Sequence, residues 1–428
     1  MSTKSQQAKG FLRRSGNQPL DIYQFLETQD HVEPFLSITR YNQFRLRGLE
    51  IYSYHPYLEH LLRTFSASAP ELKHLNIINE HAMTGVNVEL PKIFGGRMPK
   101  LTSLTLSYLN TNLRDFTFPS LTQFNFAAGG NISVRDLTSF FGRCPSLELI
   151  RIRLSYSVQS PTHPPRRRVC LPALKELRLN QSACVTGLLD HLILPKCTEM
   201  VLKGQFSGKI LDEYGEPAAR IHPSSIDHLP VTRGITKAVA MPRSCTLSGP
   251  NGNLAFWCFD GTREHFDADF FTSFSPISVL QIKELWIGQE SIFGGRSPWK
   301  QTAAGVQGAF EVLTKVEDLT IVSCETGPVF ATLGATADGG IILPRLQSLT
   351  IYVGCGDLDI LSLIQCAKAR GEHFQPLKKV TVVWERGPGA NVMREVESIR
   401  EFVGELIHGV GETPRLVWTG KLERVHEF

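Results

Sequence analysis

The stretch Pro172-Ala173-Leu174-Lys175-Glu176-Leu177-Arg178-Leu179 carries the pattern that decides the fold. Its apolar residues follow the spacing apolar-x-x-apolar-x-apolar, and the last two face the same side of an extended strand. One such stretch is common in α/β proteins and alone indicates little. The stretch indicates a particular fold because the same spacing recurs along the chain.

The spacing recurs from the first eighth of the sequence almost to its end. Six further copies have a proline two residues before the first apolar position: Leu72-Leu75-Ile77, Leu101-Leu104-Leu106, Leu121-Phe124-Phe126, Leu147-Ile150-Ile152, Cys197-Met200-Leu202 and Leu346-Leu349-Ile351. Three copies lack the proline: Ile282-Leu285-Ile287, Val316-Leu319-Ile321 and Leu377-Val380-Val382. Weaker matches are Leu46-Leu49-Ile51, Ile226-Leu229-Val231 and Leu254-Trp257-Phe259. The mean period of about 28 residues is typical of leucine-rich repeats.

A strand of this kind buries its apolar face only when it stacks on its neighbours, so the repeat predicts an elongated core. We therefore expect an α/β fold: an irregular leucine-rich-repeat solenoid, or horseshoe, with a parallel sheet on the concave face and short helices on the convex face. Helical spacing of apolar residues predicts the intervening helices, listed here by range: 58–65, 134–143 with Ser133 as N-cap, 186–194, 266–274, 301–313, 358–369 and 392–407.

The repeats divide the chain into three segments. Residues 1–16 are polar and predict a flexible lead-in, residues 17–410 form the repeats, and residues 411–428 form a C-terminal cap that includes the strand-like Leu416-Val417-Trp418. The repeat is degenerate at about 204–260, where glycine, proline and serine are dense. Two poorly matched units or an interrupting loop both fit this region, and steps of about 28 residues favour the units.

Composition excludes several classes of protein. The 428 residues carry a net charge of only +4, too small to indicate nucleic acid by itself, and no apolar run is long enough to span a bilayer. The N-terminus lacks a signal-peptide pattern, and the odd number of cysteines, nine, contains no Cys-x-x-Cys pair. We expect an intracellular protein, cytoplasmic or nuclear, without a membrane partner. Familiar catalytic and phosphate-binding motifs are missing, so we expect no enzyme activity, no cofactor and no metal.

Candidate binding residues are those that alternate with the core positions of the strands: Arg151, Arg153, Glu176, Arg178, Glu199, Lys203, Trp286, Tyr352 and Lys379. The arginines and Lys203 are expected on adjacent strands, where guanidinium groups favour an acidic segment of a partner protein. Trp286 is a typical interface anchor. A solvated sheet face held together by salt bridges explains the same charges.

The run Pro164-Pro165-Arg166-Arg167-Arg168 is the strongest basic stretch. This run is typical of a nuclear localisation patch or a phosphate contact. Together with the central arginine row, formed by Arg151, Arg153 and Arg178, it supports an alternative function as a nucleic-acid-binding repeat protein. Bracketing prolines and the lack of interleaved aromatic residues favour an exposed loop instead. Nucleic acid is therefore the less favoured partner.

Three features of the sequence carry a family resemblance: an N-terminal segment, an aromatic-rich first repeat and a recurring phrase between repeats. The segment is Arg14-Ser15-Gly16-Asn17-Gln18-Pro19-Leu20-Asp21-Ile22, and the phrase is Phe141-Gly142-Arg143-Cys144-Pro145-Ser146-Leu147-Glu148. Together they resemble the F-box and leucine-rich-repeat proteins of mushroom-forming fungi. The resemblance covers roughly residues 12–410. It implies a substrate-recognition part of an F-box subunit of a cullin-RING ubiquitin ligase. No apolar helical pattern of an F-box precedes residue 14, so the ligase adaptor is an expected partner only if an F-box lies upstream; a truncated paralogue without ligase function is the alternative.

Overall fold

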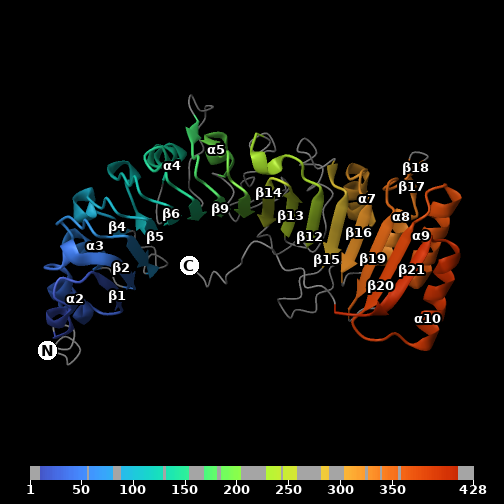
Figure 1. Cartoon of the computed structure of the whole chain (residues 1–428), viewed down its shortest axis with the longest axis horizontal. Coiled ribbons are helices and arrows are strands. Elements are labelled where there is room, and N and C mark those ends of the chain that lie inside the picture. Colours follow the sequence, from blue (N-terminus) through green and yellow to red (C-terminus); the bar gives the residue numbers. More distant parts are fainter. Residues whose placement is uncertain are drawn as a thin grey trace. The chain divides into compact units, whose positions relative to one another are not determined.

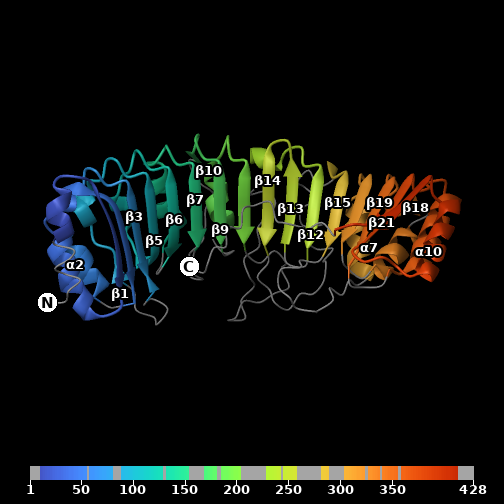
Figure 2. The ribbon, with the colours of Figure 1, turned by 60° about the horizontal axis from the view of Figure 1, so that its bottom comes forward.

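The computed structural model describes residues 10–54, 57–80, 88–128, 132–153, 168–180, 185–203, 228–241, 244–257, 281–288, 303–322, 326–337, 340–354 and 358–412. These residues form a mixed α/β fold with mostly parallel strands and short helices (Figures 1 and 2). The chain divides into two compact units at the boundary between Cys197 and Thr198, called unit 1 and unit 2 below. None of the helices in the described ranges is long and apolar enough to cross a membrane.

In unit 1 the described residues form a parallel sheet of seven main strands, each hydrogen-bonded to the next. In spatial order they are β1 (Leu20–Leu26), β2 (Leu46–Ser53), β3 (His74–Asn79), β5 (Ser103–Asn110), β6 (Gln123–Ala128), β7 (Leu149–Arg153) and β9 (Glu176–Asn180). Short strands are β4 (Val88–Glu89), β8 (Val169–Cys170) and β10 (Leu192–Ile193). The α-helices are α2 (Val32–Thr39), α3 (Leu58–Arg63), α4 (Val134–Phe141) and α5 (Val185–Asp190); 3-10 turns are Gln29–His31, Gln43–Arg45, Ile93–Gly96 and Leu113–Asp115.

The core of unit 1 consists of the residues that the repeat predicted. Residues at the second apolar position of each copy pair across the strands in the order Leu49, Leu75, Leu104, Phe124, Ile150 and Leu177, and all are at most 2% exposed. Phe124 lies 4.8 Å, ring to ring, from Phe140 of α4. The helices therefore cover this face of the sheet, and we call the opposite one the open face of unit 1 (Figure 2).

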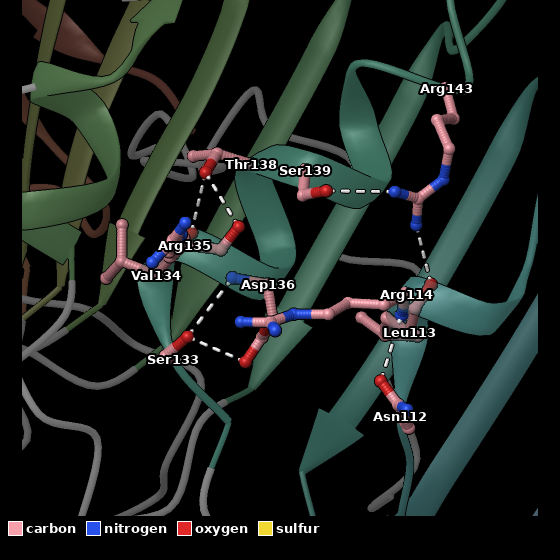
Figure 3. A network of polar contacts seen from close by, with 10 residues as sticks. All are labelled: Asn112, Leu113, Arg114, Ser133, Val134, Arg135, Asp136, Thr138, Ser139 and Arg143. Atoms are coloured by element: carbon pink, nitrogen blue, oxygen red, sulfur yellow. Dashed lines mark hydrogen bonds and ion pairs between the residues drawn. The ribbon is translucent and has the colours of Figure 1, made fainter. Parts of the chain in front are cut away.

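Helix α4 begins where the sequence predicts it. The backbone N–H of Asp136 donates to Ser133 Oγ at 3.1 Å, and that hydroxyl donates to Asp136 Oδ2 at 2.7 Å, so Ser133 is the N-cap (Figure 3). Asp136 also forms an ion pair with Arg114. Burial raises the pKa of Asp136, but the hydrogen bonds from Ser133 and Arg114 outweigh it and leave the pKa below its usual value.

Three arginines stabilise the connections between strands in a similar way. Each donates to backbone carbonyls about one repeat earlier in the chain: Arg45 to Gln18 O at 2.8 Å, Arg143 to Leu113 O at 2.8 Å (Figure 3), and Arg370 of unit 2 to Ile342 O at 2.9 Å. A guanidinium has five N–H donors and satisfies carbonyls that would otherwise stay unpaired inside the protein. Arg370 is fully buried, and burial lowers its pKa.

The described residues of unit 2 form nine main strands. In spatial order they are β11 (Glu199–Lys203), β14 (Gly252–Trp257), β13 (Ser244–Gly249), β12 (Lys237–Met241), β15 (Glu284–Gly288), β16 (Asp318–Val322), β19 (Ser348–Val353), β20 (Lys379–Trp384) and β21 (Glu405–Val410). All pairs are parallel except those of β13, which runs opposite to both neighbours. Remaining elements are β17 (Thr336–Ala337) with β18 (Gly340–Ile341), helices α7 (Ala303–Val312), α8 (Gly327–Leu333), α9 (Ile360–Glu372) and α10 (Ala390–Glu397), and 3-10 turns Pro230–Thr232 and Ser398–Glu401.

Among the described residues of 204–260, the strands do not follow the register of the two weak repeats that the sequence predicts. The predicted strand Ile226-Leu229-Val231 is replaced by a 3-10 turn at Pro230–Thr232, and the strand follows at β12. β12, β13 and β14 form an antiparallel meander, with β14 beside β11 and β12 beside β15. Gly252, at φ +127°, lies at the tight turn into β14, where Leu254 and Phe256 are buried; Phe259, the last apolar position of the predicted copy, lies outside the described residues.

Two predicted segments differ from the structure, and three more lie wholly or partly outside the described residues. The predicted helix 392–407 is wrong in its second half, because α10 ends at Glu397 and β21 occupies Glu405–Val410. The predicted lead-in 1–16 overlaps a helical turn at residues 10–15, whose Ser15 Oγ accepts a bond from Arg45 at 2.8 Å. The predicted helix 266–274, residues 164–167 of the basic run and the C-terminal strand at Leu416–Trp418 lie outside the described residues, whereas Arg168 of the run is described and exposed.

Candidate functional site

The open face of unit 1 presents three residues from each main strand, because successive side chains of a strand alternate between faces. Strand pairing aligns them in three rows. The middle row runs across all seven strands and consists of Tyr23, Glu50, Asn76, Thr105, Asn125, Arg151 and Arg178. Charged and aromatic groups gather at the two ends of this row, so the ends are the candidate sites.

The arginine cluster is one end and comprises four of the predicted residues, Arg151, Arg153, Glu176 and Arg178. Arg151 Nη2 lies 3.2 Å and Arg178 Nε 2.5 Å from the same oxygen, Glu176 Oε1. The Arg151 side chain remains 35% exposed, whereas Arg178 is 16% exposed. Two strands thus bring the guanidinium groups of Arg151 and Arg178 to one carboxylate.

Arg153 has an aromatic neighbour that the sequence did not predict. Its guanidinium carbon lies 5.9 Å from the ring centroid of Tyr108, within the range of a cation–π contact. Tyr108 occupies an irregularity in the pairing of β5 with β6 and has a φ of +58°, in the left-handed region. Backbone strain of this kind is maintained only where surrounding contacts fix it. Here Asn79 Nδ2 donates to Tyr108 O at 3.1 Å.

The other predicted residues, Lys203, Trp286 and Tyr352, belong to unit 2. Lys203 pairs with Trp257 at the end of β11, and Tyr352 is half-buried on β19, two strands away from Trp286. Trp286 Nε1 donates to Glu284 Oε1 at 2.5 Å, and Lys237 Nζ lies 4.6 Å from its ring centroid. Lys237 also forms an ion pair with Glu284 at 2.7 Å. The ring proposed as a partner anchor is therefore already in contact with a cation of the same chain.

The aromatic patch is the opposite end of the unit 1 face and was missed in the sequence. It comprises Tyr23 and Phe25 of β1, Tyr52 of β2 and Tyr54 just after it, with neighbouring ring centroids 5.4–6.4 Å apart. Tyr23 is 64% and Tyr54 47% exposed. The first repeat was placed at Leu46, so β1 was not recognised as a strand of the sheet. The alternation from Leu20 to Leu26 was the available signal.

A carboxylate, Glu50, lies next to the aromatic patch. Its Oε1 accepts from Tyr52 Oη at 2.6 Å and from Asn76 Nδ2 at 2.8 Å. Burial, followed by the hydrogen bond and negative charge of Glu50, raises the pKa of Tyr52 to about 12. Tyr52 therefore stays protonated at neutral pH and keeps donating to Glu50.

The strands between these ends are polar and uncharged on the open face. β5 contributes Ser103, Thr105 and Ser107, and β6 contributes Gln123, Asn125 and Ala127. Asn125 Nδ2 donates to Thr105 Oγ1 at 3.2 Å, so these side chains bond to each other. The open face of unit 1 thus has an aromatic and acidic end, a neutral centre and an arginine end.

The described ranges contain no group of three or more His, Cys, Asp or Glu side chains suited to a metal ion. No family model matches this sequence. A search of curated proteins also found no match.

Proposed function

We propose that this chain is a non-catalytic protein-binding solenoid that recognises an acidic segment of a partner protein through the arginine cluster. The observation that carries the proposal is the shared carboxylate: Arg151 and Arg178 both contact Glu176 Oε1. Glu176 stands in for a partner carboxylate, because it already forms on this face the type of contact that an acidic ligand would make. Arginine suits this role because its planar fork matches a carboxylate with two N–H donors.

A repeating backbone contact supports the solenoid architecture. Just before a strand, a backbone N–H donates to the equivalent carbonyl of the preceding unit: Lys73 N to Arg47 O and Lys175 N to Glu148 O, both at 2.8 Å, in unit 1. Unit 2 has Gln347 N to Glu317 O and Lys378 N to Gln347 O, also at 2.8 Å. Recurrence of one contact with the repeat is typical of stacked units that contact only their neighbours. In this proposal the open face is the concave surface of an irregular leucine-rich-repeat horseshoe.

The resemblance to F-box and leucine-rich-repeat proteins extends the proposal to a biological role. A chain that belonged to that class would use this face to recruit a substrate to a ubiquitin ligase. Affinity purification from the native cells tests this extension separately: recovery of the ligase adaptor supports it, and its absence leaves a free-standing binding solenoid.

Binding of defined peptides tests the primary proposal. We would titrate the full chain with a nine-residue Gly/Ser peptide bearing two central glutamates, and with the same peptide bearing glutamines. The charged peptide should bind more tightly, and Arg151→Glu together with Arg153→Glu should weaken it about 100-fold, since each charge-assisted bond contributes roughly 1.5–3 kcal/mol. The matched control is Lys100→Glu, which reverses an exposed charge paired with Glu71 away from the arginine cluster.

Three outcomes would contradict the proposal. They are equal affinity for the two peptides, an unchanged affinity in the double arginine variant, or tighter binding of a single-stranded oligonucleotide than of the acidic peptide. In the last case a steep loss of affinity with added salt would identify a nucleic-acid-binding protein instead.

A further inference from the structure

The first three strands of unit 1 present an open face with the opposite electrostatic character to that of the arginine cluster. Their nine aligned positions, three per strand, include the carboxylates Asp21 and Glu50 but neither lysine nor arginine. Asp21 forms an ion pair with Arg47, the residue of β2 just before the first aligned position, Gly48. The hydrogen bond from Arg47 lowers the pKa of Asp21. His74 occupies the position in β3 nearest to this pair. The remaining carboxylate, Glu50, has neutral hydrogen-bond partners, Tyr52 and Asn76, among the residues that the structure describes.

Glu50 retains bonding capacity on this face. Both of its hydrogen bonds, from Tyr52 and Asn76, reach Oε1, and Oε2 has no partner among the described residues. Asn76 Oδ1 is in addition a buried acceptor without a hydrogen-bond partner in the part of the chain that the structure describes. Because that oxygen is buried, an incoming ligand does not reach it, and Asn76 acts by holding Glu50 Oε1. Glu50 Oε2 is thus the acceptor that this face offers next to the aromatic patch.

A cation fits these surroundings better than other ligands. Aromatic faces carry partial negative charge and attract ammonium groups, and exposed tyrosines such as Tyr23 and Tyr54 leave this charge accessible. A lysine ammonium has three N–H donors and no acceptor, which matches the acceptor Glu50 Oε2. Nucleic acid would stack on the same rings, but its phosphates would meet the carboxylate of Glu50.

We propose that the aromatic patch with Glu50 and Asn76 is a second recognition site on unit 1 that binds a lysine side chain of a partner protein. The ammonium group lies over the exposed ring of Tyr23 and donates to Glu50 Oε2, while the aliphatic stem packs on Phe25 and Tyr54. This inference rests on the proposed protein-binding function but uses different residues. The arginine variants therefore serve as an internal control for it.

The test compares two nine-residue Gly/Ser peptides, one with a central lysine and one with norleucine, which keeps the stem and lacks the charge. NMR-monitored titration of the full chain should give about tenfold tighter binding for the lysine peptide. Glu50→Gln, which keeps an acceptor oxygen for Tyr52 and Asn76, should remove most of that difference, and Tyr23→Ala should weaken lysine binding several-fold. Tyr41→Ala is the matched control, because Tyr41 is 75% exposed and lies outside the patch.

Two results together support the proposal. The Glu50→Gln variant loses its preference for the lysine peptide while its thermal unfolding is unchanged. The double variant Arg151→Glu with Arg153→Glu binds the lysine peptide as the native sequence does. Equal affinity for lysine and norleucine, or no detectable binding at millimolar peptide, would overturn it. So would full lysine preference in Glu50→Gln. Loss of lysine binding only in the arginine variant would likewise refute the aromatic patch and leave the arginine cluster as the binding site.

Discussion

The two ends of the open face of unit 1 differ in charge although they are built on the same strand framework. Glu50 and Arg151 occupy equivalent positions between core residues, in one register row. Glu50 is surrounded by tyrosines and an asparagine, whereas Arg151 shares a carboxylate with a second arginine. The repeat therefore constrains the core positions and leaves the alternating positions open to binding chemistry.

The two carboxylates of this comparison are held in different ways. Glu176 is bracketed by two guanidinium groups, so its negative charge is compensated within the chain. Within the described part of the chain, Glu50 accepts from the neutral donors Tyr52 and Asn76, and in our proposal its charge is available to an incoming group. The same contrast separates Glu50 from Glu284 of unit 2, which is paired with Lys237. A carboxylate with neutral partners is thus the feature that marks the aromatic patch as a cation site.

Removing the internal carboxylate of the arginine cluster should sharpen the difference between the ends. Glu176→Gln releases Arg151, so acidic peptides should bind about threefold to tenfold more tightly, as expected for one partly exposed ion pair. Lysine peptides should bind as before. Titration of the variant with both peptides measures this. If the acidic peptide instead bound more weakly, Glu176 would be needed to orient the arginines and would not be a competitor.

A change on the helix side of the sheet should leave both ends intact. Asp136→Asn removes the charge that interacts with Arg114 and the start of α4, and should reduce the free energy of unfolding by about 1 kcal/mol at pH 7. The folded pKa of Asp136 is lowered, so its stabilisation is fully present above its unfolded pKa of 3.8 and is lost as the pH falls through the lowered folded pKa. Denaturant unfolding should give a smaller difference between the variant and the native sequence at pH 3 than at pH 7. A change in either peptide affinity would mean that the open face depends on α4.

Much of the fold was predictable from the apolar spacing, because burial against neighbouring strands fixes those positions. Leu177 and Leu179 of the opening stretch are buried, and Arg178 between them faces the other side, as the alternation requires. The same reasoning placed Arg151, Arg153 and Glu176 together. Periodicity also located α4, since Ser133 caps it as expected.

Other features depend on contacts that no local pattern records. The meander from β12 to β14 reverses one strand, and a fixed 28-residue step cannot represent a reversal. β1 lacks the full spacing, so the aromatic patch was not foreseen. The position of Tyr108 beside Arg153 depends on an irregularity in β5 whose local sequence has no turn signal.

The most direct test of the central claim, that one face carries two sites of opposite charge preference, is the dependence of affinity on charge spacing. Four strand intervals separate β2 from β7, about 19 Å, and an extended segment covers this distance with about six residues. We would titrate the full chain with Gly/Ser peptides carrying one lysine and one glutamate separated by two, six or ten residues, in both orders. Our account predicts a clear affinity maximum near six in one order, lost on combining Glu50→Gln with Arg151→Glu. Affinity independent of spacing and order would contradict it.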